Sequence, residues 1–269
     1  MGESVTYAAE RQHRIYLDVC ERGSVSVNEL AEHFGVSKAT IRTDLTTLEN
    51  EGLLLRTHGG AIPRDESFPL PLTSRAQEDF LSERAFHAEK ERIAEAAVGL
   101  VEDGDYLLVD NGTTALAFAR RLAESEWSDI TVYSNDLLVL EALENNPSIS
   151  ANVLPGKIRN GFHYAYGEAT IASLQDAHFT KLFLTTSAMD IENGLTVVKP
   201  HLSNLKRAMI DASKAVVLIT DSSKFGTTRF KKFANCDEVD VLITDSGMGA
   251  ENLSALRSIV GRLIVVDSE

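Results

Sequence analysis

The sequence predicts a two-domain α/β protein, in which a small, mainly helical domain precedes a larger domain built on a mostly parallel sheet. The chain has 269 residues, which is longer than most single domains. Three helical patterns follow one another before residue 52, and from residue 105 apolar runs of strand length alternate with amphipathic, helix-like runs. Hydrophobic residues make up 43% of the chain, enough to bury a sizeable core.

The chain is strongly acidic, with 26 basic and 40 acidic residues and a formal net charge of −14. Residues 1–64 contain seven basic and nine acidic residues, so most of the negative charge lies beyond them. Such a surface repels phosphates and argues against indiscriminate binding of nucleic acid. If DNA is bound, a few placed charges and the shape of the protein must bind it.

The sequence predicts neither export nor a membrane span nor a metal. No apolar run reaches the roughly 20 residues that a membrane-spanning helix needs, and the segment MGESVTYAAERQ lacks the pattern of a signal peptide. Cys20 and Cys236 lie far apart, without histidines at ligand spacing. We therefore expect a cytoplasmic protein without a disulfide, a metal site or another cofactor.

The first three helices have clear start and stop signals. The periodicity of 11–22 predicts the first helix. Ser26, followed three residues later by a glutamate, begins the second helix with a capping box, and Gly35 ends it. Ser37 is the expected N-cap of the third helix, which stops at Gly52. The short turn before the third helix has helix-turn-helix spacing.

The third helix and the segment after it predict a surface that reads DNA. Burying Ile41, Leu45 and Leu48 leaves a small, polar and cationic face, which an element that enters the major groove requires. The run 53–62 predicts a β-hairpin, or wing, that turns at 58–60. The candidate DNA-binding residues are Ser37, Lys38, Thr40, Arg42, Thr43, Thr46, Arg56 and His58.

The pattern alone leaves two alternatives open. The three helices also fit a module that contacts only other proteins. Arg42 also fits an ordinary surface arginine, or one paired internally with Asp44 or Glu49.

A linker is predicted after the wing, because 64–73 contains two prolines among polar residues. The run 74–101, rich in Ala, Glu and Arg, predicts one or two helices that bridge the domains. The expected boundaries are 1–63 for the DNA-binding domain, 64–86 for the linker and bridging helix, and 87–269 for the α/β domain.

Apolar strands and amphipathic helices alternate through the larger domain, which predicts a parallel sheet covered by helices on both faces. The predicted strands are 106–110, 130–134, 151–155, 181–186, 215–221, 239–245 and 262–267. The predicted helices are 114–124, 136–146, 168–177, 201–213 and 250–261.

Polar residues gather after five of these strands, at 110–114, 134–136, 156–157, 187–190 and 221–224. Carboxyl ends of parallel strands share the edge where open α/β sheets bind ligands. The run 112–114 opens a helix and suits an anion. Lys224 suits a phosphate, with Lys157, Arg159 or Lys206 as further candidates, and the Asp and Asn side chains suit sugar hydroxyls. The candidate ligand-binding residues are Asp110, Gly112, Thr113, Thr114, Asn135, Gly156, Lys157, Lys206, Asp221, Ser222 and Lys224.

Strand-to-helix turns also collect these residue types without a ligand, so one such turn alone is weak support. Neither the GxxxxGK[ST] loop of nucleotide-binding proteins nor a GxGxxG motif follows a strand. Nucleotide and NAD chemistry are therefore disfavoured.

The stretch ELAEHFGVSKATIRTDLTTLENEGLLLRTHGGAIP closely resembles the N-terminal domain of the DeoR-type family of bacterial sugar-catabolism repressors. The stretches DGDYLLVDNGTTALAFARRL, FLTTSAMDIENGLT and ITDSSKFG resemble the C-terminal sensor domain of the same family. The resemblance implies a winged helix-turn-helix and a sensor domain with the fold of ribose phosphate isomerases, which binds a phosphorylated sugar or related metabolite. Carried over by position, the effector-site pattern matches Asp110, Gly112, Thr113, Thr114, Asn135, Lys206, Asp221, Ser222, Lys224 and Phe225.

The chain departs from the family pattern at several places. Thr43 stands where the family often has a second basic residue. The sensor domain departs at 155–156, at 186–189, near Asn204 and in the aromatic stretch 162–167. These departures bear on the operator and on the identity of the effector more than on binding itself.

We expect a transcriptional regulator without enzymatic activity. It is expected to be a dimeric or tetrameric repressor of a carbohydrate-metabolism operon, whose affinity for operator DNA depends on a phosphorylated sugar. The alternatives are a sugar-phosphate isomerase-like enzyme fused to a helix-turn-helix, and an interaction module that binds no DNA. Isomerisation needs a placed carboxylate base, and 186–190 does not reproduce the acidic residues of the enzyme relatives.

Overall fold

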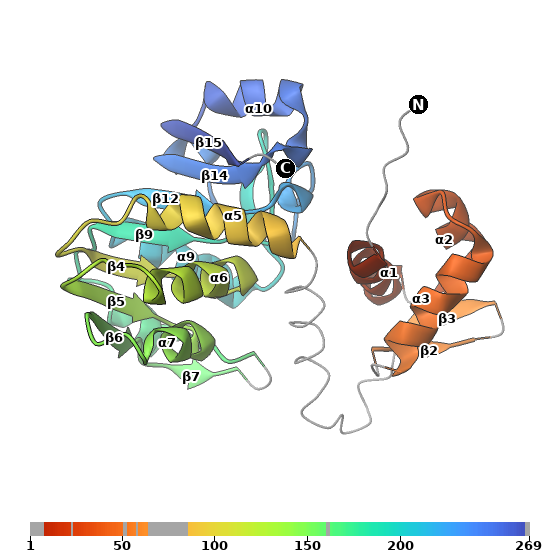
Figure 1. Cartoon of the computed structure of the whole chain (residues 1–269), viewed down its shortest axis with the longest axis horizontal. Coiled ribbons are helices and arrows are strands. Elements are labelled where there is room, and N and C mark those ends of the chain that lie inside the picture. The colour runs from red at the N-terminus through yellow and green to blue at the C-terminus, as the bar shows by residue number, and fades with distance from the viewer. Residues whose placement is uncertain are drawn as a thin grey trace. The chain divides into compact units, whose positions relative to one another are not determined.

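The computed structural model describes residues 8–22, 24–50, 53–57, 59–63, 86–159 and 162–266 (Figure 1). The chain divides into two compact units, Met1–His87 and Ala88–Glu269. Each unit has hydrophobic core residues of its own. None of the described helices combines the length and the apolar character that a membrane span requires.

Three helices and a three-stranded sheet form the N-terminal unit. The helices are α1 (Ala8–Arg22), α2 (Val27–Phe34) and α3 (Lys38–Asn50), and the strands are β1 (Val25–Ser26), β2 (Leu54–Arg56) and β3 (Gly60–Pro63). Strands β2 and β3 pair as the antiparallel hairpin predicted for the wing. Strand β1 pairs with β3 and was not predicted, because a strand of two residues has no periodicity to detect. His58, a candidate DNA-binding residue, lies outside the described residues.

The predicted helix signals hold in the structure. The Ser26 hydroxyl accepts from the Glu29 amide at 3.2 Å, and the Glu29 carboxylate accepts from the Ser26 amide at 3.1 Å, which completes the capping box. Gly35 ends α2 in the left-handed conformation with φ 63°. The stripe of Ile41, Leu45 and Leu48 is fully buried at 0% exposure. Burial of this stripe turns the polar side of α3 toward solvent.

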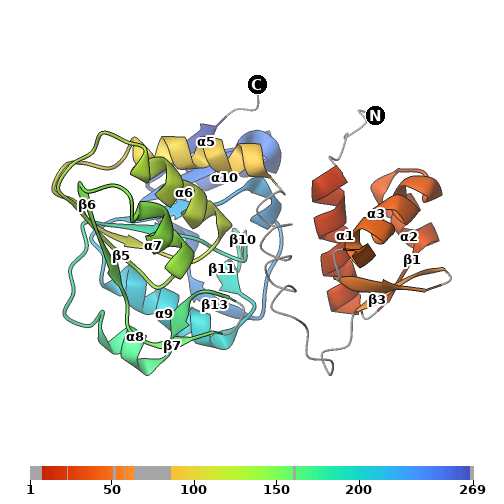
Figure 2. The same ribbon diagram turned by 60° about the horizontal axis from the view of Figure 1, so that its bottom comes forward.

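A seven-stranded parallel sheet forms the centre of the C-terminal unit, and all seven predicted strands belong to it. In spatial order the strands are β15 (Arg262–Val266), β14 (Val241–Asp245), β12 (Val216–Ile219), β9 (Lys181–Leu184), β4 (Tyr106–Val109), β5 (Ile130–Ser134) and β6 (Ile149–Val153). The helices α5 (His87–Val98), α6 (Thr113–Ala123) and α7 (Leu137–Leu143) cover one face, and α9 (Pro200–Asp211) lies on the other (Figures 1 and 2). Helices α8 (Glu168–Ala172) and α10 (Ala250–Arg257) and the short 3₁₀ turns η1 (Ser222–Lys224), η2 (Cys236–Glu238) and η3 (Ser246–Met248) complete the unit.

The end of the predicted bridging run is a core helix of the C-terminal unit. Ile93, Ala94 and Ala97 of α5 are fully buried against the sheet. The run therefore does not bridge the two units from residue 87 onward, because burying this apolar face ties it to the sheet. Residues 74–85 lie outside the described residues.

A second, antiparallel sheet corrects the interpretation of 187–190 as a polar strand end. It contains β10 (Ala188–Asp190), β11 (Gly194–Val197) and β13 (Lys231–Ala234) in the order β10-β11-β13. Ala188 and Met189 are fully buried. The carboxylate of Asp190 accepts from the Asn193 amide at 2.5 Å and so closes the turn between β10 and β11. This segment therefore packs and turns the chain instead of adding polar groups to the sheet edge.

Candidate functional site

Helix α3 carries a buried carboxylate that is engaged inside the N-terminal unit. Asp44 is 2% exposed. Its Oδ2 accepts from Arg11 Nε at 2.6 Å, and its Oδ1 accepts from Gln12 Nε2 at 3.0 Å. This ion pair ties α3 to α1. It also removes the negative charge of Asp44 from the outward face of α3.

Lys38 and Arg42 are the exposed cations of α3. Glu49, the other acid of α3, accepts from the backbone amide of Arg56 at 3.0 Å. Neither Asp44 nor Glu49 is paired with Arg42 among the hydrogen bonds and ion pairs of the described residues, so the predicted internal pairing is not seen. The exposed side of α3 thus has the cationic character that phosphates require.

The hydroxyl groups of α3 are used within the helix and against the wing. The Ser37 hydroxyl accepts from the Thr40 amide at 3.1 Å, which confirms the expected N-cap. The hydroxyls of Thr43 and Thr46 donate to the carbonyl groups four residues earlier, at 3.1 and 2.8 Å. Arg56 Nη1 donates to the Thr46 hydroxyl at 2.8 Å. The wing strand and α3 therefore present one continuous surface.

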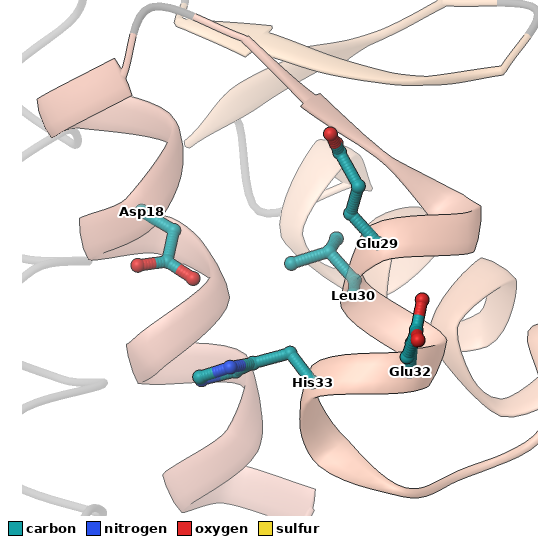
Figure 3. A pocket seen from close by; sticks show the side chains of 5 residues that line it. All are labelled: Asp18, Glu29, Leu30, Glu32 and His33. Carbon is teal, nitrogen blue, oxygen red and sulfur yellow. The ribbon is translucent and has the colours of Figure 1, made fainter.

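A hollow on another side of this unit has the wrong charge for DNA. It is lined by Asp18, Glu29, Leu30, Glu32 and His33, and Figure 3 shows His33 extending from α2 toward α1. Three of the five side chains are carboxylates, which repel phosphates. Among the described residues, no group of acids, histidines and cysteines has the arrangement of a metal site.

The carboxyl ends of β4 and β9 are the topological switch point of the parallel sheet. The chain proceeds from β4 through β5 to β6 on one side, and from β9 through β12 to β14 and β15 on the other. Open α/β sheets bind ligands in the crevice at this point, because the connections leave it in opposite directions. Asp110 directly follows β4 and Thr185 directly follows β9.

A buried network joins these two strand ends to α9. Asp110 and Lys206, 0% and 3% exposed, form an ion pair. Asp110 Oδ2 also accepts from the Thr185 amide at 3.0 Å and from its hydroxyl at 2.8 Å. Lys206 Nζ donates to the Thr185 carbonyl at 3.1 Å. Two predicted residues thus meet, but the charge of Lys206 is neutralised by Asp110.

The turn after β4 opens α6 with amide groups that have no hydrogen-bond partner among the described residues. Gly112 is the N-cap, with φ 133° and no side-chain cap, and its own amide donates to Asp136 Oδ2 at 3.3 Å. The first amides of a helix have no partner within the helix, so those of Thr113 and Thr114 suit an anion. Asp136 caps α7 through the Leu138 amide at 2.9 Å. It therefore joins the turns after β4 and β5.

Three buried oxygen atoms beside this turn have no hydrogen-bond partner in the described part of the chain. They are Asp110 Oδ1, Asn111 Oδ1 and Asn135 Oδ1. Asn135 is fully buried, and its Nδ2 donates to the Ala165 carbonyl at 3.1 Å. Buried acceptors without a partner are costly, and sugar hydroxyls are donors that would satisfy them.

The turn after β12 adds a carboxylate surrounded by positive charge. Asp221 is 1% exposed and accepts from the Ser223 amide at 3.1 Å. Burial by itself would raise the pKa of Asp221, but the positive charges of Lys224 and Lys90 and the hydrogen bonds from Ser223 lower it. Lys90 is a residue of α5 and is 3% exposed. Asp221 therefore stays ionised despite its burial.

Ser222 faces a carboxylate from the next strand. Its amide and its hydroxyl donate to Asp245 at 2.7 and 2.6 Å. Sequence reasoning missed Asp245, Lys90 and Thr185. The repeated LITD that ends both 215–221 and 239–245 was a signal for Asp245, whereas Lys90 and Thr185 had none.

Gly156 and Lys157 have a different position, after β6. A Cβ at Gly156 would lie 2.2 Å from Thr170 Oγ1, so packing against α8 accounts for this glycine. Lys157 is exposed and begins β7 (Lys157–Ile158), which pairs with β8 (Ala165–Tyr166).

Taken together, the two units define a DNA-binding regulator, in which a winged helix-turn-helix is joined to an α/β ligand-sensing domain. Comparison with known proteins identifies the family. The DeoR-like helix-turn-helix domain matches residues 11–66, and the DeoR C terminal sensor domain matches residues 85–246. The chain belongs to the DeoR family of transcriptional regulators.

Relatives along nearly the whole chain are named as regulators and not as enzymes. The putative aga operon transcriptional repressor of Escherichia coli is 32% identical over 262 residues, covering 97% of this chain and 95% of the relative. The HTH-type transcriptional regulator GlpR of Haloferax volcanii is 32% identical over 252 residues, covering 93% and 94%. The glycerol-3-phosphate regulon repressor of Escherichia coli is 32% identical over 237 residues, covering 88% and 90%. Among solved structures, a D-ribose-5-phosphate isomerase aligns with a TM-score of 0.39 and 15% identity, over 52% of this chain and 54% of the isomerase.

Proposed function

We propose that the chain is a cytoplasmic, homo-oligomeric repressor of a carbohydrate-metabolism operon. Helix α3 and the wing bind operator DNA. A phosphorylated sugar binds at the carboxyl edge of the sheet, beside Asp110 and the first turn of α6, and changes the affinity for DNA. The effector acts through its different affinities for the two states of the repressor.

The effector part of this proposal rests on two kinds of polar group that lie close together at the switch point, backbone amide donors and buried oxygen acceptors. The first turn of α6 supplies amide donors for a phosphate. Asp110, Asn111 and Asn135 supply buried oxygen atoms without partners in the described part of the chain. A phosphorylated sugar contains both complementary groups, an anion and a row of hydroxyl donors.

The DNA part of the proposal rests on the distribution of charge over α3. Both of its acids are engaged, Asp44 with Arg11 and Glu49 with the Arg56 amide. The exposed cations then face phosphates without a competing carboxylate on the same helix face.

Binding to the DNA upstream of its own gene, measured by fluorescence anisotropy at several salt concentrations, tests the DNA part. Arg42→Ala should weaken binding and reduce the slope of log affinity against log salt by about 0.9, the value for one phosphate contact. Arg257→Ala, which removes an exposed arginine of α10, is the matched control. Equal affinity and slope in wild type and Arg42→Ala would contradict this use of α3.

Chemical unfolding followed by the fluorescence of Trp127 tests the effector part. Trp127 is the single tryptophan, and its Nε1 donates to the Val98 carbonyl at 3.1 Å, so it reports on the C-terminal unit. A phosphorylated sugar at a hundred times its Kd should add about 2.7 kcal/mol to the stability, and its unphosphorylated parent less. Asp110→Asn should abolish this increment and Asp176→Asn, at an exposed site, should retain it. An equal increment from both compounds would refute the phosphate requirement.

A further inference from the structure

A two-stranded ribbon lies against the end of β5, next to the proposed effector site. It consists of β7 and β8, and its second half pairs with the turn after β5. The Ala165 amide donates to the Asn135 carbonyl at 2.7 Å, and the Leu137 amide donates to the His163 carbonyl at 2.8 Å. The aromatic stretch 162–166 is therefore fixed beside a residue of the effector site.

The ribbon also contacts the beginning of α9. The Tyr164 hydroxyl and His201 Nε2 lie 3.2 Å apart, and the rings of Tyr166 and His201 have centroids 4.6 Å apart. Lys206, the partner of Asp110, follows His201 by five residues on the same helix. With a rise of 1.5 Å per residue, the two positions lie about 7.5 Å apart along the axis. The contact with the ribbon and the Asp110–Lys206 pair therefore lie within two turns of each other on one helix.

Positive charge gathers where the ribbon meets α9. Arg159 Nη1 donates to the Tyr164 hydroxyl at 2.7 Å, and its guanidinium carbon lies 3.5 Å from the centroid of the Phe162 ring. Lys199 is the N-cap residue of α9 and makes no side-chain cap bond. Burial first, and then the positive charges of Arg159 and Lys199, lower the pKa of His201. Both cations are therefore close enough to His201 to act on it.

No acidic partner of these cations is found among the described residues. Within the described part of the chain, neither Arg159 nor Lys199 forms an ion pair with a carboxylate. The Tyr164 ring that holds Arg159 is 1% exposed, so the guanidinium is held in place instead of moving freely in solvent. Arg159 and Lys199 are like charges near one another, and they repel each other because no carboxylate of the described residues is paired with either. A bound anion would relieve that repulsion, and the positive end of α9 adds to the attraction.

We propose that Arg159, Lys199 and His201 form a second anion subsite, so that the effector carries two anionic groups. One group is the phosphate bound at the first turn of α6, and the other is a phosphate or a carboxylate bound where the ribbon meets α9. The ligand class is then a sugar bisphosphate or a phosphorylated sugar acid. This inference rests on the proposed function, because it extends the same effector site.

Inorganic phosphate tests the two subsites without a choice of sugar. Stability is measured by Trp127 fluorescence in urea, as phosphate replaces chloride at constant ionic strength. Above both dissociation constants, the slope of the unfolding free energy against ln[phosphate], divided by RT, gives the number of bound ions, about two for the wild type. Arg159→Ala and Thr113→Asp should each lower the number to about one. Arg257→Ala should leave it at the wild-type value. Lys199→Ala, at an exposed position, replaces Arg159→Ala if that variant fails to fold.

The outcomes separate the two proposals. The second subsite is overturned if the wild type binds one phosphate and this phosphate is lost in Thr113→Asp but kept in both Arg159→Ala and Lys199→Ala. The proposed function is not affected by that result. No bound phosphate in the wild type overturns both. With two subsites, 6-phosphogluconate or fructose 1,6-bisphosphate should bind at least tenfold more tightly than glucose 6-phosphate or fructose 6-phosphate. Arg159→Ala should remove that preference. Whichever of the two doubly charged compounds binds more tightly shows whether the second anionic group of the effector is a carboxylate or a phosphate.

Discussion

Removing the carboxylate of Asp44 should strongly destabilise the DNA-binding unit and leave the stability of the sensor unit unchanged. Asp44 and Arg11 are 2% and 7% exposed, and two hydrogen bonds from Arg11, at 2.6 and 3.2 Å, join them. Gln12 adds a third at 3.0 Å. Asp44→Ala removes one member of this buried ion pair, and breaking a buried pair in this way costs about 3–5 kcal/mol. That is a large share of the stability of any small domain, about 5–15 kcal/mol at most.

Urea unfolding with two probes separates the two units. Circular dichroism at 222 nm reports on helices throughout the chain, and Trp127 fluorescence reports on the C-terminal unit. Asp44→Ala should split the dichroism transition and move its helical N-terminal part to lower urea, with the Trp127 transition unchanged. Glu32→Ala, which removes an exposed acid of α2, is the control.

A double variant shows whether the cost comes from breaking the charged pair. Arg11→Met with Asp44→Leu replaces both members of the ion pair by apolar side chains, and it should recover most of the lost stability. A shift in Asp44→Ala no larger than in Glu32→Ala would refute the reasoning. So would a double variant as unstable as the single one, since the loss would then come from packing.

Three further predictions concern other sites. Gly60→Ala should destabilise the N-terminal unit by about 3 kcal/mol or more in thermal unfolding, because the added Cβ would lie 1.8 Å from a backbone oxygen. Gly59→Ala is the control and should change the stability little, because a Cβ there meets open space. Burial would raise the pKa of Asp105, but hydrogen bonds that include one from Lys181 lower it. The ionised carboxylate therefore stabilises the folded state at pH values above the pKa that Asp105 has in the unfolded chain. This stabilisation is lost as the pH falls through the lower pKa of the folded state. Asp105→Asn should therefore cost about 1.5–3 kcal/mol near pH 7 and flatten the stability profile below about pH 5 in urea titrations; an unchanged profile would contradict this. Burial raises the pKa of the Cys236 thiol to about 11. In a variant whose other cysteine is replaced by serine, Cys236 should therefore not react with a disulfide reagent at pH 8 until the chain is unfolded. Rapid reaction of the folded protein would refute this protection.

The parallel sheet was predictable because its strands are continuous apolar runs. The central strands β12, β9 and β4 are almost entirely buried between helices, and nothing but their own sequence is needed to detect them. The antiparallel sheet was not predictable in the same way. Its strand β13 begins with two exposed lysines, Lys231 and Lys232, and becomes a strand only by pairing with β11. That pairing depends on the tertiary structure, which no local pattern encodes.

The candidate site shows the same limit. Asp110 and Lys206 were both predicted from strand-end and family patterns, and both lie in the site. The sequence suggested that Lys206 neutralises a phosphate, whereas in the structure it pairs with Asp110, 96 positions away. A fully buried carboxylate needs a counterion, and which lysine supplies it depends on the fold. The residue roles in DNA and effector binding remain predictions.

The electrostatic attraction between Lys90 and Asp221 has a consequence for the coupling between elements of the C-terminal unit. Lys90 belongs to α5, the first described helix beyond the segment that follows the wing, and its charge lowers the pKa of Asp221 at the ligand edge. The free energy of keeping the Lys90 ammonium group buried therefore depends on how strongly Asp221 is engaged elsewhere. Such a dependence is reciprocal. A ligand that engages Asp221 is therefore expected to weaken the attraction on Lys90, and a displacement of α5 is expected to alter the affinity for that ligand by the same free energy. This interaction couples the first described helix of the C-terminal unit to the candidate ligand edge of the sheet.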